Sequence, residues 1–184
     1  MRNEKDDTGT GQTKPIQINI PISEEVIRGL KVGDFVEING TILCGRDAVL
    51  PKMVKMAEAG NDKTLMTMLR GSVIFHTAVS IAGIGPTSSN KVEIEGSIPG
   101  LSKAGVKIHL GKGALSADTM AALQTYNSVF AITPPTTAYF SSKIISQKVA
   151  MFPEEGMEAL YEVTVEGFPA IIAIAHGESI FTNT

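Results

Sequence analysis

A short polar segment after an apolar run is the first candidate for chemistry in this sequence. The segment Gly85–Lys91 carries the hydroxyl groups of Thr87 and Ser88 and the cation of Lys91, and it follows the largely apolar run Ser72–Ile84. Such a run is typical of a strand that is buried on both faces. Hydroxyl groups can bind a ligand or, once activated, transfer a proton, and a lysine attracts an anion. We predict an active-site loop here; the alternative is an ordinary turn into the next strand.

Two further cations are flanked by glycine and follow predicted strands. Arg46 lies in the segment Cys44–Ala48, and Lys112 lies in the segment Leu110–Gly113. Glycine-rich loops at strand ends are where α/β folds commonly collect ligand groups, so the three loops are candidates to converge on one anion. Arg46 would offer a planar fork to a carboxylate, whereas Lys112 would act as a point charge. Taken singly, each is also compatible with an ordinary solvated loop cation.

The elements that must position these loops alternate between strand and helix through the middle of the chain, which predicts a mixed α/β fold. Asp47 or Ser116 is expected to cap a helix, and Pro51 suits a first helical turn. Strands are predicted near 15–20, 35–43, 72–82, 105–110, 128–132, 147–151, 161–166 and 169–175, and helices near 47–59, 62–69, 117–126, 136–145 and 154–160.

Composition predicts one domain and excludes some classes of partner. The 184 residues, 43% of them hydrophobic, suit a single core over residues 15–184, preceded by a loose polar tail at 1–14. The formal charge of −3 offers no basic field for nucleic acid. We find neither an apolar run long enough for a membrane span nor an apolar signal core, so we expect a cytoplasmic protein.

The cysteine and the histidines limit what metal chemistry this chain can carry. Cys44 is the only cysteine, so the chain forms no internal disulfide and cannot hold an iron–sulfur cluster alone. A buried core role is expected for Cys44, although a nucleophile near Arg46 is the alternative. His76, His109 and His176 are far apart in the sequence, so metal ligation is not expected, and core or half-buried positions are expected for His76 and His109.

The glycine-flanked motifs, in their order and spacing, resemble those of one family of hydro-lyases. Over residues 15 to 182 the chain resembles the beta subunit of iron–sulfur-dependent class I fumarases and L-tartrate dehydratases. Any one of the motifs is weak, but the ordered set is fairly specific. The matching segments are Gly45–Ala48, Gly85–Ser88, Gly111–Gly113, Glu155–Leu160, Val163–Val165 and Glu166–Ala170.

The resemblance implies a swivelling β/β/α domain that completes an active site with an alpha subunit carrying a [4Fe–4S] cluster. Thr87 would be the catalytic base, while Arg46, Lys91, Lys112 and Ser88 would bind a small dicarboxylate. The implied reaction is reversible hydration of a fumarate-like alkene to a 2-hydroxy acid, with fumarate to L-malate first in order. Alternatives are tartrate or a substituted malate, or a non-catalytic anion-binding module. The chain could assemble as a dimer of heterodimers or as a homodimer.

Three departures from the family pattern bear on substrate choice. Lys91 stands where the family usually has arginine, which keeps the charge but loses the bidentate fork. Leu50 replaces a common histidine, and the segment Pro134–Thr137 replaces a stretch of small residues. These changes leave the expected fold intact, but they leave open both the identity of the dicarboxylate and whether the site is active.

Overall fold

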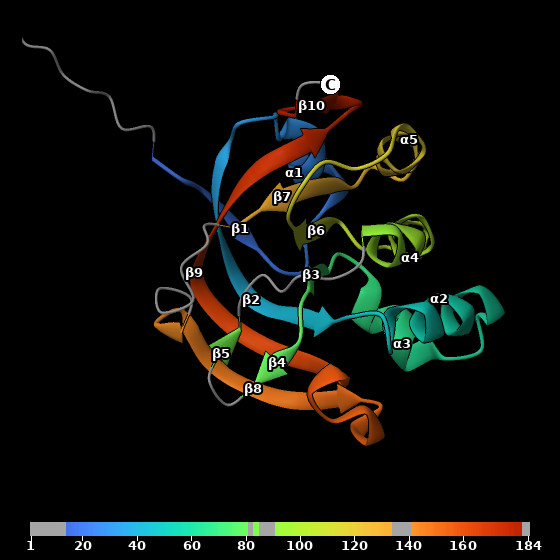
Figure 1. Cartoon of the computed structure of the whole chain (residues 1–184). Coiled ribbons are helices and arrows are strands. Elements are labelled where there is room, and N and C mark those ends of the chain that lie inside the picture. Colours follow the sequence, from blue (N-terminus) through green and yellow to red (C-terminus); the bar gives the residue numbers. More distant parts are fainter. Residues whose placement is uncertain (1–13, 81–82, 85–90, 134–140, 182–184) are drawn as a thin grey trace, which may run out of the picture.

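A closed ring of five strands forms the centre of the fold. A computed structural model describes residues 14–80, 83–84, 91–133 and 141–181, and for 91–93 the backbone only. Parallel strands pair in the order β2 (Phe35–Gly45), β3 (Val73–His76), β6 (Ile108–Gly111) and β7 (Val129–Ile132). The long strand β9 (Leu160–Ala175) pairs antiparallel with both β7 and β2, and this double pairing closes the ring. The result is a barrel-like sheet with helices on its outside (Figure 1).

Shorter strands extend this ring at its sides. β1 (Ile16–Asn19) pairs in parallel with β2, and β8 (Ile144–Met151) and β10 (Glu178–Ser179) pair antiparallel with β9. A separate two-stranded hairpin consists of β4 (Val79–Ser80) and β5 (Gly83–Ile84). In Figure 1 the hairpin lies near β8, at the end of the ring opposite α1.

The helices are packed mainly on one side of the ring, as Figure 1 shows for α2 to α5. Side-chain caps begin three of them: Ser23 accepts a hydrogen bond from the backbone amide of Val26, Asp62 from that of Leu65, and Ser116 from that of Thr119. The helices are α1 (Glu24–Gly29), α2 (Leu50–Ala59), α3 (Lys63–Leu69), α4 (Lys91–Lys103) and α5 (Ala117–Thr125), with a short 3-10 helix η1 (Pro153–Glu158).

Alternation along the strands sorts side chains between the ring interior and the helix layer. Phe75 and Leu110 belong to the interior cluster, while Ile74 packs in the outer cluster with residues of α2 and α3. Since His76 and His109 have the same parity in their strands as Ile74, they lie on the helix side. The interior is closed by α1 at one end and by the β4–β5 hairpin at the other, because both contribute buried residues to it.

Most of the predicted elements are confirmed. The predicted strands at 15–20, 35–43, 105–110 and 128–132 correspond to β1, β2, β6 and β7, and the helices at 47–59, 62–69 and 117–126 correspond to α2, α3 and α5. Pro51 lies in the first turn of α2, and Ser116 caps α5 as expected. The 154–160 prediction corresponds to η1, which is a 3-10 helix. The observed strands and helices form a mixed α/β fold, as predicted.

Other predictions of secondary structure are wrong. The strand predicted over 72–82 ends at His76, where the Thr77 amide donates to the Phe75 carbonyl at 2.9 Å and turns the chain sharply. Asp47 does not cap α2, whose N-cap is Val49. The helix predicted over 136–145 is contradicted at its end by β8, while 134–140 lies outside the described residues. The strands predicted at 161–166 and 169–175 are one strand, β9.

Candidate functional site

Four parallel strands end side by side, and this edge brings two of the predicted site residues together. Gly45, the last residue of β2, is paired with His76, the last residue of β3. The next-to-last residues of β3 and β6 are paired, and so are the last residues of β6 and β7. The residues that directly follow these strands therefore form one row: Arg46, Thr77, Lys112 and Thr133.

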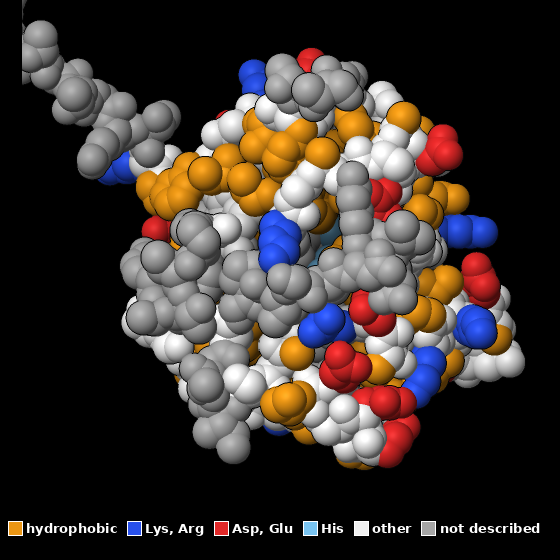
Figure 2. All heavy atoms as spheres, viewed as in Figure 1, with side chains coloured by type: hydrophobic (Ala, Val, Ile, Leu, Met, Phe, Trp, Pro, Cys, Tyr) orange, Lys and Arg blue, Asp and Glu red, His pale blue; other side chains and the backbone are white. Residues whose placement is uncertain are grey.

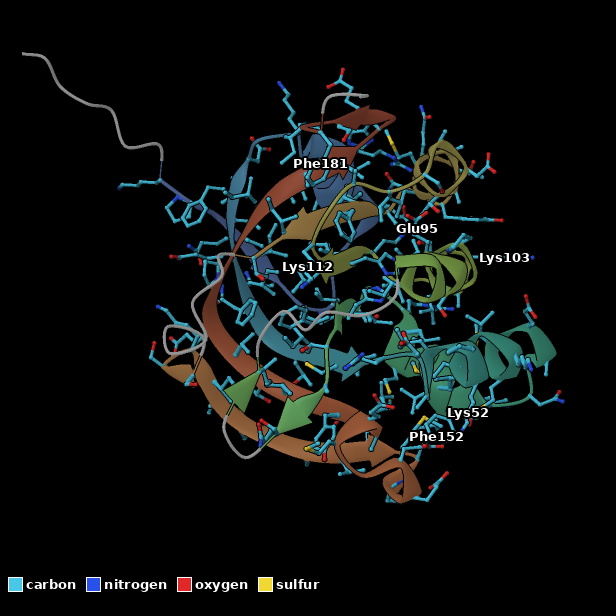
Figure 3. All side chains as sticks on the ribbon, in the orientation of Figure 1. Lys52, Glu95, Lys103, Lys112, Phe152 and Phe181 are labelled. Atoms are coloured by element: carbon cyan, nitrogen blue, oxygen red, sulfur yellow. The ribbon has the colours of Figure 1, made fainter. Side chains whose placement is uncertain are left out.

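The row places Arg46 and Lys112 two strand spacings apart, or about 10 Å between backbones. Figure 3 labels Lys112 on the loop after β6, in the middle of the face viewed, and Figure 2 shows basic side chains in the same region. Lys112 is exposed, so it is free to reach toward a ligand. The predicted convergence of these two loops on one edge agrees with the strand register.

The third predicted loop is only partly visible in the structure. Thr87 and Ser88 lie outside the described residues, and the side chain of Lys91 is not described. The backbone of Lys91 begins α4, whose 13 residues extend about 18 Å and end just before β6 starts. Because α4 connects two parallel strands, it returns antiparallel to them, and its first residue lies toward the edge where Arg46 and Lys112 are found. The segment leads into a helix, not into the next strand.

Arg46 is loosely held and has an unused hydrogen-bond donor. Its terminal nitrogens lie 4.0 Å from a carboxylate oxygen of Asp47 and 3.8 Å from one of Glu158, while its Nε is buried without a hydrogen-bond partner. The side chain is only 19% exposed. A buried donor without a partner is costly, so the guanidinium is well suited to an anion that supplies the missing acceptor.

Unpartnered buried polar atoms gather at this same edge. Besides Arg46 Nε, they include His76 Nδ1 at the end of β3 and Thr133 Oγ1 directly after β7. Within the described part of the chain a fourth such atom, Ser72 Oγ, precedes β3 at the other edge. Buried polar groups in native proteins nearly always have partners, so the three unpartnered atoms at the ends of β2, β3 and β7 need an explanation. A polar ligand bound at this edge would offer them partners.

A buried hydrogen-bonded chain leads inward from His76. His76 Nε2 lies 3.1 Å from His109 Nδ1, and His109 Nε2 lies 2.9 Å from Ser102 Oγ. Burial lowers the pKa of His76 to about 4 and holds the pKa of His109 well below 6.5, with the neighbouring His76 lowering it further. Both rings are therefore neutral at pH 7. The two histidines, far apart in the sequence, are in direct contact, and their predicted core placement is confirmed.

Polar contacts fix the elements around the edge. Glu95 on α4 accepts hydrogen bonds at 3.0 Å from the Ser116 amide and the Thr119 hydroxyl, which joins α4 to the start of α5 (Figure 3). On the other side, Lys52 of α2 forms an ion pair with Glu155, and its Nζ lies 5.3 Å from the centre of the Phe152 ring. These contacts hold η1, which carries Glu158, against α2.

Cys44 lies in the interior of the ring, as predicted for a core residue. Its side chain is fully buried and belongs to the interior cluster, and burial raises the pKa of the thiol far above its ordinary value. Such a thiol is a poor nucleophile and a poor metal ligand. Among the residues that the structure describes, no three His, Cys, Asp or Glu side chains are grouped to hold a metal ion.

A family model described as the fumarase C-terminus matches residues 1–184 of the chain. The chain belongs to this fumarase C-terminal family. It is 30% identical over 183 residues to a putative fumarate hydratase class I of Geobacillus stearothermophilus, covering 92% of this chain and 34% of that protein. It is 29% identical over 177 residues to a putative L(+)-tartrate dehydratase subunit beta of Methanocaldococcus jannaschii, covering 87% and 88%.

A third relative is the anaerobic class I fumarate hydratase of Escherichia coli, 27% identical over 177 residues that cover 90% of this chain and 32% of that protein. The chain thus spans about a third of the length of these fumarate hydratases, but most of the length of the tartrate dehydratase subunit. The resemblance inferred from the glycine-flanked motifs is confirmed. The helices of the described residues include none that is long and apolar enough to cross a membrane.

Two polar residues at this edge of strand ends, His76 and Thr133, were not predicted as site residues. His76 was interpreted as a core histidine because it follows three apolar residues, and Thr133 lies at the end of an apolar strand without a glycine beside it. Thr133 directly follows the strand predicted at 128–132, and strand ends are where ligand groups of α/β folds collect, so its position was a usable signal. His76 lies inside the strand predicted at 72–82, and only the observed end of β3 places it at this edge.

Proposed function

We propose that this chain is the beta subunit, or the corresponding domain, of a hydro-lyase that hydrates a fumarate-like dicarboxylate to a 2-hydroxy acid. The observation that carries the proposal is the row of strand ends on which Arg46, Lys112 and three unpartnered buried polar atoms lie. Such an edge suits a carboxylate ligand. Membership of the fumarase C-terminal family supplies the reaction class.

In this proposal Arg46 and Lys112 bind one carboxylate of the substrate, with Lys91 and Ser88 contributing from the loop before α4. Their positive charge also stabilises the negative charge that develops when the neighbouring carbon loses its proton. Thr87 is the proposed base at that carbon. Its hydroxyl needs activation by nearby cations or by a base from a partner. Each role is transferred by resemblance to a position in this sequence and is tested below.

The proposed iron–sulfur cluster does not fit the residues of this chain. One cysteine, buried in the ring interior with a raised thiol pKa, cannot hold a [4Fe–4S] cluster. The proposal therefore assigns the cluster to an alpha subunit or a separate domain, and no step is derived through it here. We further propose that residues 15–184 form one domain of the swivelling β/β/α type, with its outer helices on one side of a closed ring.

Fumarate is the proposed substrate, and tartrate is the second candidate. Relatives named as fumarate hydratases support the first, and those named as tartrate dehydratase beta subunits support the second. Lys91 in place of the usual arginine favours a changed geometry of carboxylate binding, because a lysine cannot make the bidentate hydrogen bonds of a guanidinium. Substrate choice is therefore the property that most needs measurement.

The test is anaerobic co-expression with the candidate alpha subunit, followed by hydration and dehydration assays on fumarate, mesaconate and tartrate. We expect activity that requires both chains and that falls by about a hundredfold or more in Thr87→Ala, since general acid–base groups contribute about that much. The matched control is Thr67→Ala, which removes an exposed hydroxyl bonded to a backbone carbonyl of α3. A cluster-containing complex that is inactive on all three substrates would contradict the proposal.

A further inference from the structure

The chain of His76, His109 and Ser102 has two self-consistent arrangements of its protons. In the first, the Ser102 hydroxyl donates to His109 Nε2, His109 Nδ1–H donates to His76 Nε2, and His76 therefore carries its own proton on Nδ1. In the second, every hydrogen bond is reversed and His76 Nδ1 presents a lone pair. Because the two rings are neutral, each has one donor and one acceptor, and the state of Ser102 fixes the state of His76.

The position of His109 determines where His76 Nδ1 points. β3 lies between β2 and β6, and His109 is paired with Ile74, two residues before the end of β3. His76 Nε2 therefore reaches sideways to β6 and back from the edge. The two nitrogens of an imidazole point away from each other, so Nδ1 points away from His109 and β6, at the strand end where His76 is paired with Gly45, the residue before Arg46.

The unpartnered state of Nδ1 selects between the two arrangements once an anion is present. With a proton on Nδ1, His76 is a buried donor without an acceptor, the same condition that holds for Arg46 Nε. A carboxylate that reached both atoms would satisfy the two donors together. A lone pair on Nδ1 would instead face the anion and repel it. Anion binding thus favours the arrangement in which Ser102 donates.

We propose that His76 is a specificity-determining residue of this edge, donating from Nδ1 to a ligand carboxylate that Arg46 also binds, with His109 and Ser102 as positioning residues that hold its ring in place. The inference rests on the proposed function for the identity of the ligand as a dicarboxylate. It adds a neutral donor to the cations already assigned. The hydrogen bond from a neutral donor depends on the orientation of the acceptor oxygen and not on charge alone. It therefore helps the site to discriminate among anions of equal charge.

Two substitutions of His76 separate the ligand contact from the contact with His109. The amide of Asn places its nitrogen at the same number of bonds from Cβ as His Nδ1, whereas the amide of Gln places it at the position of His Nε2. In the complex with the alpha subunit, we expect His76→Asn to keep KM for fumarate within about threefold. We expect His76→Gln to raise KM by about tenfold to a hundredfold, the equivalent of losing one hydrogen bond to a charged group.

Ser102→Ala tests the positioning role without touching the ligand. Loss of the Ser102 hydroxyl leaves His109 Nε2 without its partner, which releases the ring that positions His76. We expect a rise in KM of about tenfold with little change in kcat, because the reacting groups stay in place. Ser97→Ala is the matched control, since Ser97 is on the same helix and, like Ser102, only 2% exposed. It should leave KM unchanged.

The direct readout is the ¹⁵N spectrum of the full chain labelled at histidine, with succinate as an unreactive dicarboxylate probe. We expect succinate to move His76 Nδ1 to the shift of a protonated nitrogen in wild type, and to do so only at a higher succinate concentration in Ser102→Ala. His176 is the internal control, because its Nε2–H donates to the Leu30 carbonyl near α1, away from the edge.

The outcomes distinguish this proposal from the one on which it rests. An active complex in which His76→Gln and His76→Asn have equal KM values, with no succinate-dependent shift at His76, would overturn the role of His76 and leave the hydro-lyase intact. A succinate-dependent shift at His76 in a complex without hydration activity would support the anion contact and contradict the hydro-lyase. Thermal unfolding of each variant identifies any rise in KM that comes from misfolding.

Discussion

The buried histidine pair predicts a loss of stability on mild acidification. The pKa of His76 is lowered from 6.5 to about 4 by burial, so the unfolded chain binds a proton at a pH where the folded chain does not. Stability is then fully present above pH 6.5, falls as the pH drops below that value, and continues to fall until the pH reaches about 4. The pKa of His109 is also lowered, so it contributes in the same direction.

The size of the effect follows from the two pKa values of His76. A fall from 6.5 to about 4 corresponds to about 3 kcal/mol of unfolding free energy when the titration is complete. At about pH 5, roughly 2 kcal/mol of this should already be lost, and His109 adds to the loss. Glu24 contributes little at this pH. Its pKa is held below 4.5, chiefly by its hydrogen bond with Lys107, so the stability it adds is lost only as the pH falls through that lower value.

The assay is urea unfolding of the isolated chain at about pH 7.5 and about pH 5, in wild type and in His76→Gln. With a slope of about 2 kcal/mol per molar urea, the wild-type midpoint should fall by about 1 M or more. In His76→Gln, which cannot ionise at this position, the loss between the two pH values should be smaller by about 2 kcal/mol. His176→Gln measures what removing any histidine does. An equal acid loss in wild type and His76→Gln would refute the reasoning, because it would mean that His76 is not held neutral by burial.

Three other substitutions or probes test further parts of the structure. Arg46→Lys should change unfolding free energy by less than about 1 kcal/mol, because its ion pairs are long, while raising KM for the dicarboxylate by about tenfold or more; urea unfolding and steady-state kinetics measure the two effects. Lys107→Met should cost about 2–4 kcal/mol in the same unfolding assay, because the carbonyls of Tyr126 and Asn127 lose their buried donor. Cys44 should react with a thiol reagent only when urea unfolds the chain; rapid labelling of the folded chain would contradict its burial.

The helix α4 shows where sequence reasoning about the fold failed. Gly96, Pro99 and Gly100 all disfavour a helix interior, so no helix was predicted there. The structure explains at least one of them: a Cβ at Gly100 would come within 2.6 Å of the Val54 side chain of α2. Close helix packing, which local propensity does not contain, overrides the poor helix formers. β9 also continues past Gly167, whose amide donates to the side chain of Asn39 at 2.8 Å, a contact between distant residues that local propensity does not contain either.

The candidate site was predictable where it depended on strand ends and not where it depended on contacts between strands. Arg46 and Lys112 were found because glycine-flanked cations after apolar runs mark strand ends, and the register then places them in one row. The pairing of His76 with His109 was not predictable, since residues 33 positions apart meet only when β3 and β6 become neighbours. Nor can any pattern of residue types identify an atom that is buried and has no partner.

The described edge offers more cations and hydrogen-bond donors than groups that could accept a proton. This imbalance supports the proposal of an active site shared with a partner. Arg46 Nε and the ammonium of Lys112 are donors, the hydroxyl of Thr133 can donate or accept, and His76 Nδ1 is a donor in the proposal above. The carboxylates of Asp47 and Glu158 that approach Arg46 are engaged by its charge. The described edge is therefore better suited to hold an anion and stabilise its charge than to accept a proton from carbon. In the proposed reaction, proton transfer would then depend on Thr87, activated by these cations or by a group that a partner brings to the edge.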